Sequence, residues 1–361
     1  MASAVCWRAV PAIIHDARIS VVMTTYNRGD LLAGALESVL AQQEDSPPFE
    51  LIVVDNNSTD NTREVIERFA KIDRRVRYVF EPQQGSSHGR NAGIHASTAP
   101  LVAFTDDDVR ADADWVAAIG RAFDEHPEAD VVGGRVLPIW PSPPPAWLTR
   151  EHWMPLALID YGDVPLAVDP NRPRCMVTAN CSFRRAMLDR VGGFGPAFQL
   201  GKKGLLGSVE DQELQLRVLQ SGGIVFYDPR VRVRAEIQPN RLERAYHRRW
   251  HTGHGYFYAL LRNRDVEETR VGTLFGVPAH LYRQAVVDLT GWLGAVLTGN
   301  RERAFTRELG LCFFVGFFRT RCRDSAAQRF GDRLAALRRF SARVRRRPRT
   351  QSAPARAAGH E

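Results

Sequence analysis

The chain has 361 residues, of which 44% are apolar and 25% are charged, and it carries a formal net charge of +8. This composition is typical of a globular protein with one large or two modest domains. The five cysteines are odd in number and form no C-x-x-C pair, which argues against a disulfide framework or a zinc site and favours a reducing compartment.

The positive charge is concentrated at one end of the chain. From residue 319 onward the sequence contains 13 arginines and 3 acidic residues, so the preceding part is close to neutral. Residues 1–17 lack the basic start and clean apolar core of a signal peptide, and we expect them to form a simple N-terminal extension. No segment reaches the ~18–20 apolar residues that a membrane-spanning helix needs.

The first 140 residues alternate between short apolar runs and helical patterns. Alternation of this kind predicts an α/β fold with a mostly parallel sheet covered by helices on both faces. The expected strands are 18–26, 49–55, 75–82, 100–106 and 129–140, and the expected helices are 28–43, 60–73, 86–97 and 112–126.

The pattern changes after residue 140. A Pro- and Trp-rich insert over 138–175 is not expected to form regular structure. Its tryptophans are expected to cover the sheet edge, and the less favoured alternative is that they stack on a sugar ring. A strand and short helix are expected within 176–194, an amphipathic helix over 209–223, and one or two strands over 224–237. Further helices are expected over 240–263, 273–297, 301–319 and 324–345.

Three consecutive carboxylates, Asp106, Asp107 and Asp108, follow the fourth expected strand. Ligands of such sheets bind beyond the carboxyl ends of the strands, and carboxylate oxygens are good ligands for a hard divalent cation. The alternative is an acidic loop that caps the next helix. The triplet by itself leaves both interpretations open.

Six segments in a fixed order make the chain resemble the family 2 glycosyltransferases, inverting enzymes with the GT-A nucleotide-sugar fold. They are SVVMTTYNR (20–28), ELIVVDNNSTDNT (50–62), GSSHGRNAGI (85–94), VAFTDDDV (102–109), ANCSFRRAMLDRVGGF (179–194) and VEDQELQLRVLQSGG (209–223). The resemblance implies a GT-A domain over 18–238, with a nucleotide-sugar-binding half (18–110) and an acceptor half (111–238). A helical C-terminal region (239–345) and a disordered basic tail (346–361) would follow.

The same resemblance implies roles for individual residues on the donor side. Thr24, Tyr26 and Asn27 would contact the base, and Asp55 and Asn56 would lie beside it. Because Asn56 stands where many members carry a second aspartate, UDP, dTDP and GDP donors all remain open. Arg90 would approach the diphosphate. Asp106 and Asp107 would lie near the nucleotide sugar, and Asp106 and Asp108 would hold Mn²⁺ or Mg²⁺, which stabilises the leaving diphosphate.

On the acceptor side, the resemblance makes Asp211 the general base that removes the acceptor hydroxyl proton. Glu210 would orient this base or touch the acceptor, although acidic residues at a helix N-terminus also suit the helix dipole. Asn180 would line the acceptor side. The chain departs from many members at Ala235, where a histidine is usual.

These features predict a metal-dependent inverting transfer of sugar from a nucleoside diphosphate to a glycan or lipid-linked acceptor in the bacterial cytoplasm. The apolar run at 309–318 followed by arginines predicts either an anchor on an anionic membrane at the inner face, or a packed helical subdomain. We expect no nucleic-acid partner. The alternative function is a catalytically inactive sugar-nucleotide-binding or scaffold protein attached to the membrane, which Asn56 and the missing histidine would favour.

Overall fold

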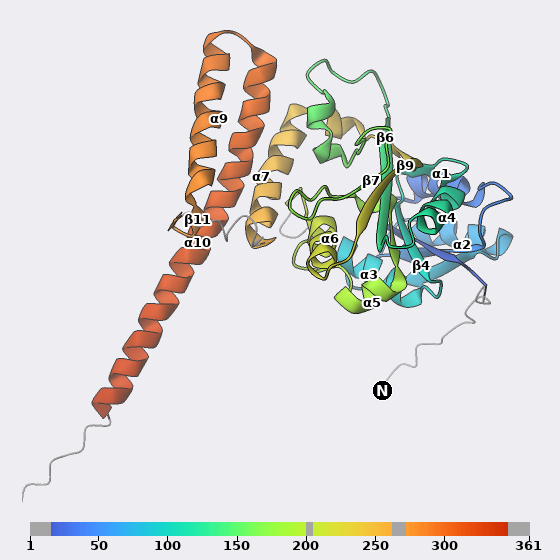
Figure 1. The fold of residues 1–361 in the computed structure, drawn as a ribbon, viewed down its shortest axis with the longest axis horizontal. Helices are drawn as coiled ribbons and strands as arrows, with labels where there is room; N and C mark the ends of the chain where they lie inside the picture. Colours follow the sequence, from blue (N-terminus) through green and yellow to red (C-terminus); the bar gives the residue numbers. More distant parts are fainter. Residues whose placement is uncertain (1–15, 200–204, 262–271, 346–361) are drawn as a thin grey trace, which may run out of the picture.

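The computed structural model describes residues 16–199, 205–261 and 272–345 (Figure 1). Most of the expected N-terminal extension, and the whole of the expected basic tail after residue 345, lie outside these residues. The described chain forms a mixed nine-stranded sheet with helices on both faces, and a group of helices beside it. The α/β architecture and the helical C-terminal region expected from the sequence are both confirmed.

The strand order of the sheet is β3-β2-β1-β4-β8-β6-β9-β5, with β7 paired to β9. Strands β1 to β4 are mutually parallel, whereas β8 joins β4 and β6 in antiparallel fashion. The strands are β1 (Ile19–Thr25), β2 (Phe49–Asp55), β3 (Val76–Phe80), β4 (Leu101–Asp106), β5 (Val109–Ala111), β6 (Val131–Ile139), β7 (Leu166–Ala167), β8 (Cys181–Arg184) and β9 (Val225–Glu236).

Two apolar clusters sandwich the sheet because alternate residues of each strand point to opposite faces. In β1, Val21 belongs to the cluster beneath α1, α2 and α4, while Val22 belongs to the cluster beneath α3, α5 and α6. Nearly all of β1, β2 and β4 is buried, as expected for strands covered on both sides. These helices are α1 (Gly29–Leu40), α2 (Thr62–Ile72), α3 (Ser86–Ala96), α4 (Trp115–Glu125), α5 (Arg185–Val191) and α6 (Glu210–Gln220).

The strand order reverses at β1, which has β2 on one side and β4 on the other. Because these strands are parallel and in register, their carboxyl ends lie at one edge of the sheet. Thr24 is aligned with Asp106, and Thr25 with Asp55. A switch point of this kind is the usual ligand-binding position in an open α/β sheet.

The Pro- and Trp-rich insert holds only short elements, namely the 3₁₀ helices η1 (Arg150–His152) and η2 (Met154–Leu156) and the strand β7. Trp140, Trp147 and Trp153 pack against the core cluster under α1 and α4. Trp147 also makes edge contacts with the rings of His247 and Phe305, at 4.9 Å between centroids in each case. The expectation that these tryptophans cover the sheet is confirmed.

The C-terminal region begins with η5 (Pro239–Leu242) and contains α7 (Arg244–Leu261), α9 (Ala279–Leu297) and α10 (Arg301–Arg345). Residues 273–278, expected to be helical, instead form a hairpin of β10 (Thr273–Leu274) and β11 (Val277–Pro278), because Phe275 and Gly276 adopt positive φ. The two helices expected over 301–319 and 324–345 are one continuous helix, since no glycine or proline separates them.

Helices α7 and α10 cross at very short range. A Cβ atom on Gly316 would lie 1.9 Å from the carbonyl oxygen of Thr252, and one on Gly255 would lie 2.0 Å from that of Phe313. The aromatic run of α10 is therefore drawn inward, and Phe314 and Phe317 are buried against α7, α9 and β11. The run at 309–318 thus packs within a helical subdomain, as one of the two interpretations of the sequence predicted.

A helix that crosses a bilayer needs about 20 predominantly apolar residues. Over the described residues, no helix combines sufficient length with sufficient apolar character to cross a membrane.

A buried carboxylate links β2 to its neighbours below the site. The Glu50 side chain is fully buried and accepts hydrogen bonds from the Ser20 hydroxyl at 2.7 Å and from the Thr98 backbone N–H at 3.0 Å. It is also paired with Arg77. Burial raises the pKa of Glu50, but the bonds from Ser20, Arg77 and Thr98 outweigh it and hold the pKa below the usual glutamate value.

We expect Glu50→Gln to lower the free energy of unfolding at pH 7 by about 3–5 kcal/mol, because the change leaves the Arg77 guanidinium buried without its charge partner. A depressed pKa stabilises the folded state above the unfolded-state value, and this contribution is lost as the pH falls through the folded-state value. The deficit of the variant should therefore shrink in acid. Urea denaturation at pH 7 and pH 4 measures it, with the exposed Glu44→Gln as control; an equal deficit at both pH values would contradict the prediction.

Candidate active site

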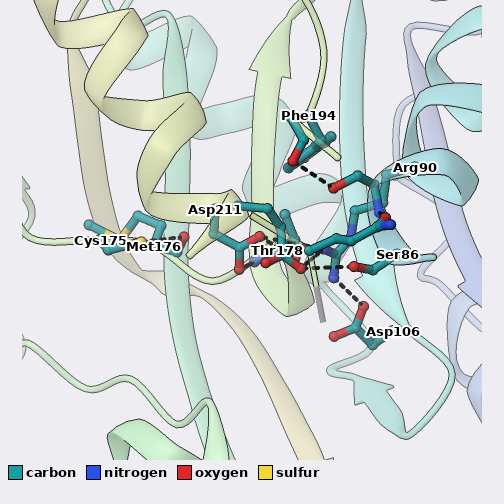
Figure 2. Close-up of polar contacts among 12 residues, drawn as sticks. Ser86, Arg90, Asp106, Cys175, Met176, Thr178, Phe194 and Asp211 are labelled. Carbon is teal, nitrogen blue, oxygen red and sulfur yellow. Dashed lines mark hydrogen bonds and ion pairs between the residues drawn. The ribbon is translucent and has the colours of Figure 1, made fainter. Parts of the chain in front are cut away.

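One guanidinium group stands at the carboxyl edge of the central strands, where the side chains of α3, α6 and β4 meet (Figure 2). Arg90, on α3, donates to Glu210 Oε1 at 3.0 Å and to Asp106 Oδ1 at 3.4 Å, and its Nη1 lies 3.5 Å from Asp211 Oδ1. Burial would lower the pKa of Arg90, but the three carboxylates hold it above its ordinary value. Arg90 therefore remains a cation and joins α3 to the end of β4 and the start of α6.

Glu210 opens α6 and serves Arg90. Its Oε1 atom accepts from Arg90 and, at 2.9 Å, from the hydroxyl of Ser86 at the start of α3. Its Oε2 atom is buried, and no partner for it occurs within the described residues. The structure thus shows Glu210 bound to the guanidinium, and the prediction that it orients Asp211 or touches the acceptor stays a prediction.

Asp211 follows in the first turn of α6 and is fixed by Thr178. The Thr178 backbone N–H donates to Asp211 Oδ2 and the Thr178 hydroxyl donates to Oδ1, both at 3.0 Å. Gln215, one turn later in α6, accepts from the Met176 N–H and donates to the Met176 carbonyl oxygen, and so fixes the chain two residues before Thr178. Burial raises the pKa of Asp211 above the usual aspartate value, and Arg90 only partly opposes it. A carboxylate held in this way is a stronger proton acceptor than an exposed one.

The next two carboxylates of the triplet face another cation. Arg28, which precedes α1, donates to Asp107 Oδ1 at 2.8 Å and to Asp108 Oδ2 at 3.0 Å. Arg241, in η5, lies 3.5 Å from Asp108 Oδ2. Burial raises the pKa of Asp107 to about 6, although Arg28 opposes it. Neither Arg28 nor Arg241 was predicted from the sequence. The available signal was the position of Arg28, directly after the residues expected to contact the base.

The loop after β1 is held to the loop after β2. Asn27 has a φ of 50°, its backbone N–H donates to the Ser58 hydroxyl, and its side-chain oxygen accepts from the Thr59 N–H at 2.7 Å. The neighbouring Tyr26 side chain is 44% exposed, and Thr24 is half-buried beside Gly89. Of the three residues predicted to contact a base, Asn27 is committed to loop structure, while Tyr26 is open to solvent.

Asp55 and Asn56 at the end of β2 are also engaged. Asp55 accepts from the Ser58 N–H at 2.9 Å and from the Tyr78 hydroxyl at 3.1 Å. Asn56 donates to the carbonyl oxygens of Glu81 and Gln83, and its own oxygen accepts from the Gly85 N–H at 2.7 Å. Asn56 therefore shapes the segment that leads into α3 and thereby positions Arg90.

Asn180, predicted to line the acceptor side, is engaged by the protein itself. Its side chain is buried and donates to the carbonyl oxygens of Arg135 and Val231, while its oxygen accepts from the Trp115 indole N–H at 2.8 Å. Three protein partners use its hydrogen-bonding capacity inside the sheet layer. Asn180 thus ties β6, β9 and α4 together, and its role on the acceptor side stays a prediction.

The carboxylates at the strand ends are the candidate ligands of a divalent cation. Within the described ranges no three His, Cys, Asp or Glu side chains converge as a complete metal site. The Asp106 side chain is 30% exposed, and its pKa is raised by burial and by the Asp108 and Asp211 carboxylates, so a cation beside it would be stabilised. The Asp108 side chain is only 9% exposed and paired with arginines. The residues fit a cation that draws most of its ligands from a bound anion.

Comparison with known proteins gives a family and a fold. Residues 20–192 match the model described as Glycosyl transferase family 2. A glucosyl-dolichyl phosphate glucuronosyltransferase from Haloferax volcanii is 28% identical over 236 residues, which are 63% of this chain and 71% of the relative. A validoxylamine A glucosyltransferase from Streptomyces hygroscopicus subsp. jinggangensis is 32% identical over 52% of this chain, and the match spans only 49% of that relative.

Among solved structures, the fold is similar to that of a mannosyltransferase from Pyrobaculum calidifontis in complex with GDP-Man and Mn²⁺. The TM-score is 0.55 at 17% identity, and the match covers 86% of this chain and 90% of the other. The GT-A fold predicted from the sequence motifs is confirmed by this likeness.

We expect Arg90→Met to lower the free energy of unfolding at pH 7.5 by about 3–5 kcal/mol, because three carboxylates lose their shared cation. Without it, the pKa values of Asp106 and Asp211, already raised, rise further above their unfolded values. Stability should therefore fall as the pH rises through them, and the deficit should be smaller at pH 5.

Chemical denaturation of wild type and variant at both pH values tests this expectation. The matched control is Arg63→Met, which breaks an exposed pair with Glu67 on α2 and should cost less than about 1 kcal/mol at either pH. A deficit for Arg90→Met that does not change with pH would show that the carboxylates do not depend on this guanidinium.

Proposed function

Because this chain belongs to the family 2 glycosyltransferases, as its motifs predicted, we propose that it moves a sugar from a nucleoside diphosphate to a hydroxyl of its acceptor with inversion and with a divalent metal. The observation that carries the proposal is the placement of Asp211. Its carboxylate is held by Thr178 on one side and lies 3.5 Å from Arg90 on the other, next to Asp106 at the strand ends.

In this proposal Asp211 is the general base. A base must accept a proton as the acceptor oxygen attacks, and its efficiency is greatest when its pKa approaches the working pH. The raised pKa of Asp211, which burial causes, moves it in that direction. Thr178 acts as a positioning residue, because its two bonds fix the plane of the carboxylate. A single attack opposite the leaving group inverts the anomeric carbon.

Arg90 and Asp106 would receive the diphosphate. A guanidinium pairs well with phosphate oxygens, and Arg90 presents its charge beside Asp106. Mn²⁺ or Mg²⁺, held by Asp106 and Asp108, would neutralise the charge that gathers on the leaving diphosphate. Since Asp108 is paired with Arg28 and Arg241, we propose that it contributes to metal binding only after these arginines shift toward the ligand.

The donor half (18–110) supplies Arg90 and Asp106, and the acceptor half (111–238) supplies Thr178 and Asp211, so catalysis requires both. The donor nucleotide is UDP, dTDP or GDP. Asn27 and Asn56 do not distinguish among them, because their side-chain oxygens already accept hydrogen bonds from neighbouring loops. Thr24, Tyr26 and Asp55 are then the proposed base contacts. A lipid-linked or glycan acceptor at the inner face of the cell membrane is proposed from the Haloferax relative, whose name describes a dolichyl phosphate substrate.

We expect one nucleoside diphosphate to raise the melting temperature of the wild type, and Mn²⁺ to increase this shift, because a ligand that binds only the folded state stabilises it. Thermal-shift assays with UDP, dTDP and GDP, each with Mn²⁺ or with EDTA, measure the effect. Asp106→Asn should remove the metal-dependent part, while the exposed Asp189→Asn in α5 should keep it. Equal shifts with Mn²⁺ and with EDTA would argue against metal-assisted donor binding.

We expect Asp211→Asn to reduce turnover about 10²–10⁴-fold while the affinity for the nucleotide stays within a few-fold of wild type, because the amide cannot accept the acceptor proton. Product formation and calorimetric titration of the nucleotide report on the two quantities separately. A catalytically inactive binding protein would show no turnover in the wild type and the same titration in the variant.

A further inference from the structure

Helix α9 packs on the side of α10 that faces away from α7 (Figure 1). The contacts of α9 with α10 and the hairpin bury one side, represented by Leu281 and Ala295. The opposite side faces away from the catalytic domain.

That opposite side is apolar, and we name it the α9 face. It consists of Val286, Leu289, Leu293, Val296 and Leu297, whose exposed fractions lie between 44% and 84%. Spacings of three and four residues place these side chains in one stripe along the helix. Isolated exposed apolar residues are common on protein surfaces, but a continuous stripe marks an interaction site.

The polar groups near the stripe are neutralised or satisfied within the protein. Asp288 is paired with Arg307 of α10 at 2.6 Å. The hydroxyls of Thr290 and Thr298 donate to carbonyl oxygens one turn earlier in α9. From 284 to 297 the helix contains no other charged residue. The α9 face can therefore enter an apolar medium without leaving a charge or a hydroxyl uncompensated.

Cations border the stripe at both ends. Arg283 is exposed at one end, and Arg301 and Arg303 are exposed at the other, with Glu302 the acid between them. The sequence beyond residue 318 adds 13 arginines against 3 acids. An apolar stripe bordered by arginines has the chemistry of a helix that lies in the headgroup region of an anionic membrane.

We propose that the α9 face docks on an anionic lipid surface, with α9 lying in the plane of the membrane. The stripe extends over roughly 16 Å at 1.5 Å per residue, too short to span a bilayer. A second copy of the chain is a poorer occupant, because the arginines of the two copies would repel one another across the contact. The docking surface is thus α9, and not the aromatic run of α10 that the sequence suggested.

The surface does not depend on the donor chemistry, so it can be tested apart from the proposed function. The full chain is mixed with vesicles of phosphatidylcholine and phosphatidylglycerol in equal parts, or of phosphatidylcholine alone, and bound protein is measured by flotation. We expect the wild type to float with the mixed vesicles and at least tenfold less with neutral ones.

Two exposed apolar changes on α9 test the stripe. Leu289→Gln with Leu293→Gln should reduce binding to mixed vesicles at least tenfold, whereas Ile72→Gln, at an even more exposed apolar position at the end of α2, should not. Unchanged melting temperature and nucleotide binding show that the variant is folded. The single change Val286→Gln should give a smaller loss in the same direction.

Three results would overturn the proposal. The first is no binding of the wild type to anionic vesicles. The second is binding that the glutamine changes leave intact, which would assign attachment to the arginines alone. The third is a wild-type dimer in light scattering that the same changes convert to a monomer, which would assign the α9 face to a second copy.

Discussion

The arrangement of the site depends on one buried cation, the guanidinium of Arg90, shared by carboxylates from separate parts of the chain. Asp106 ends β4, and Glu210 and Asp211 open α6 more than a hundred residues later. Without a cation between them these groups would repel one another in a poorly solvated space. The charge of Arg90 therefore determines how β4, α3 and α6 meet at the strand ends.

The part of the fold nearest the N-terminus follows from local patterns. Strands covered on both faces are continuously apolar, and the helices between them have a clear apolar side, so β1 to α4 could be predicted closely, with β2 matching at both ends. The carboxylates at the strand ends could be predicted as well, because parallel strands bring their ends to one edge. The short β5 was missed, since three residues carry no periodic signal.

Partners that come together only in three dimensions could not be predicted. Nothing local shows that Arg28 and Arg241 meet at Asp108, or that Thr178 holds both oxygens of Asp211. The motif around Asn180 likewise gave no sign that its amide would donate to backbone carbonyl groups of two strands. Hydropathy identified the apolar segments after residue 273 without revealing that Phe314 and Phe317 of α10 are buried and the α9 face is exposed.

Asp106 and Asp108, which are two residues apart, show how one short sequence produces two environments. Asp108 is paired with two arginines and contributes to holding η5 and α1 at the strand ends, while Asp106 is partly exposed and its pKa is raised. Buried ion pairs are costly to desolvate and often add little to stability. Apolar side chains could fill the same space at lower cost. The concentration of ion pairs at this edge of the sheet is therefore better explained by the binding of a charged ligand than by the stability of the fold.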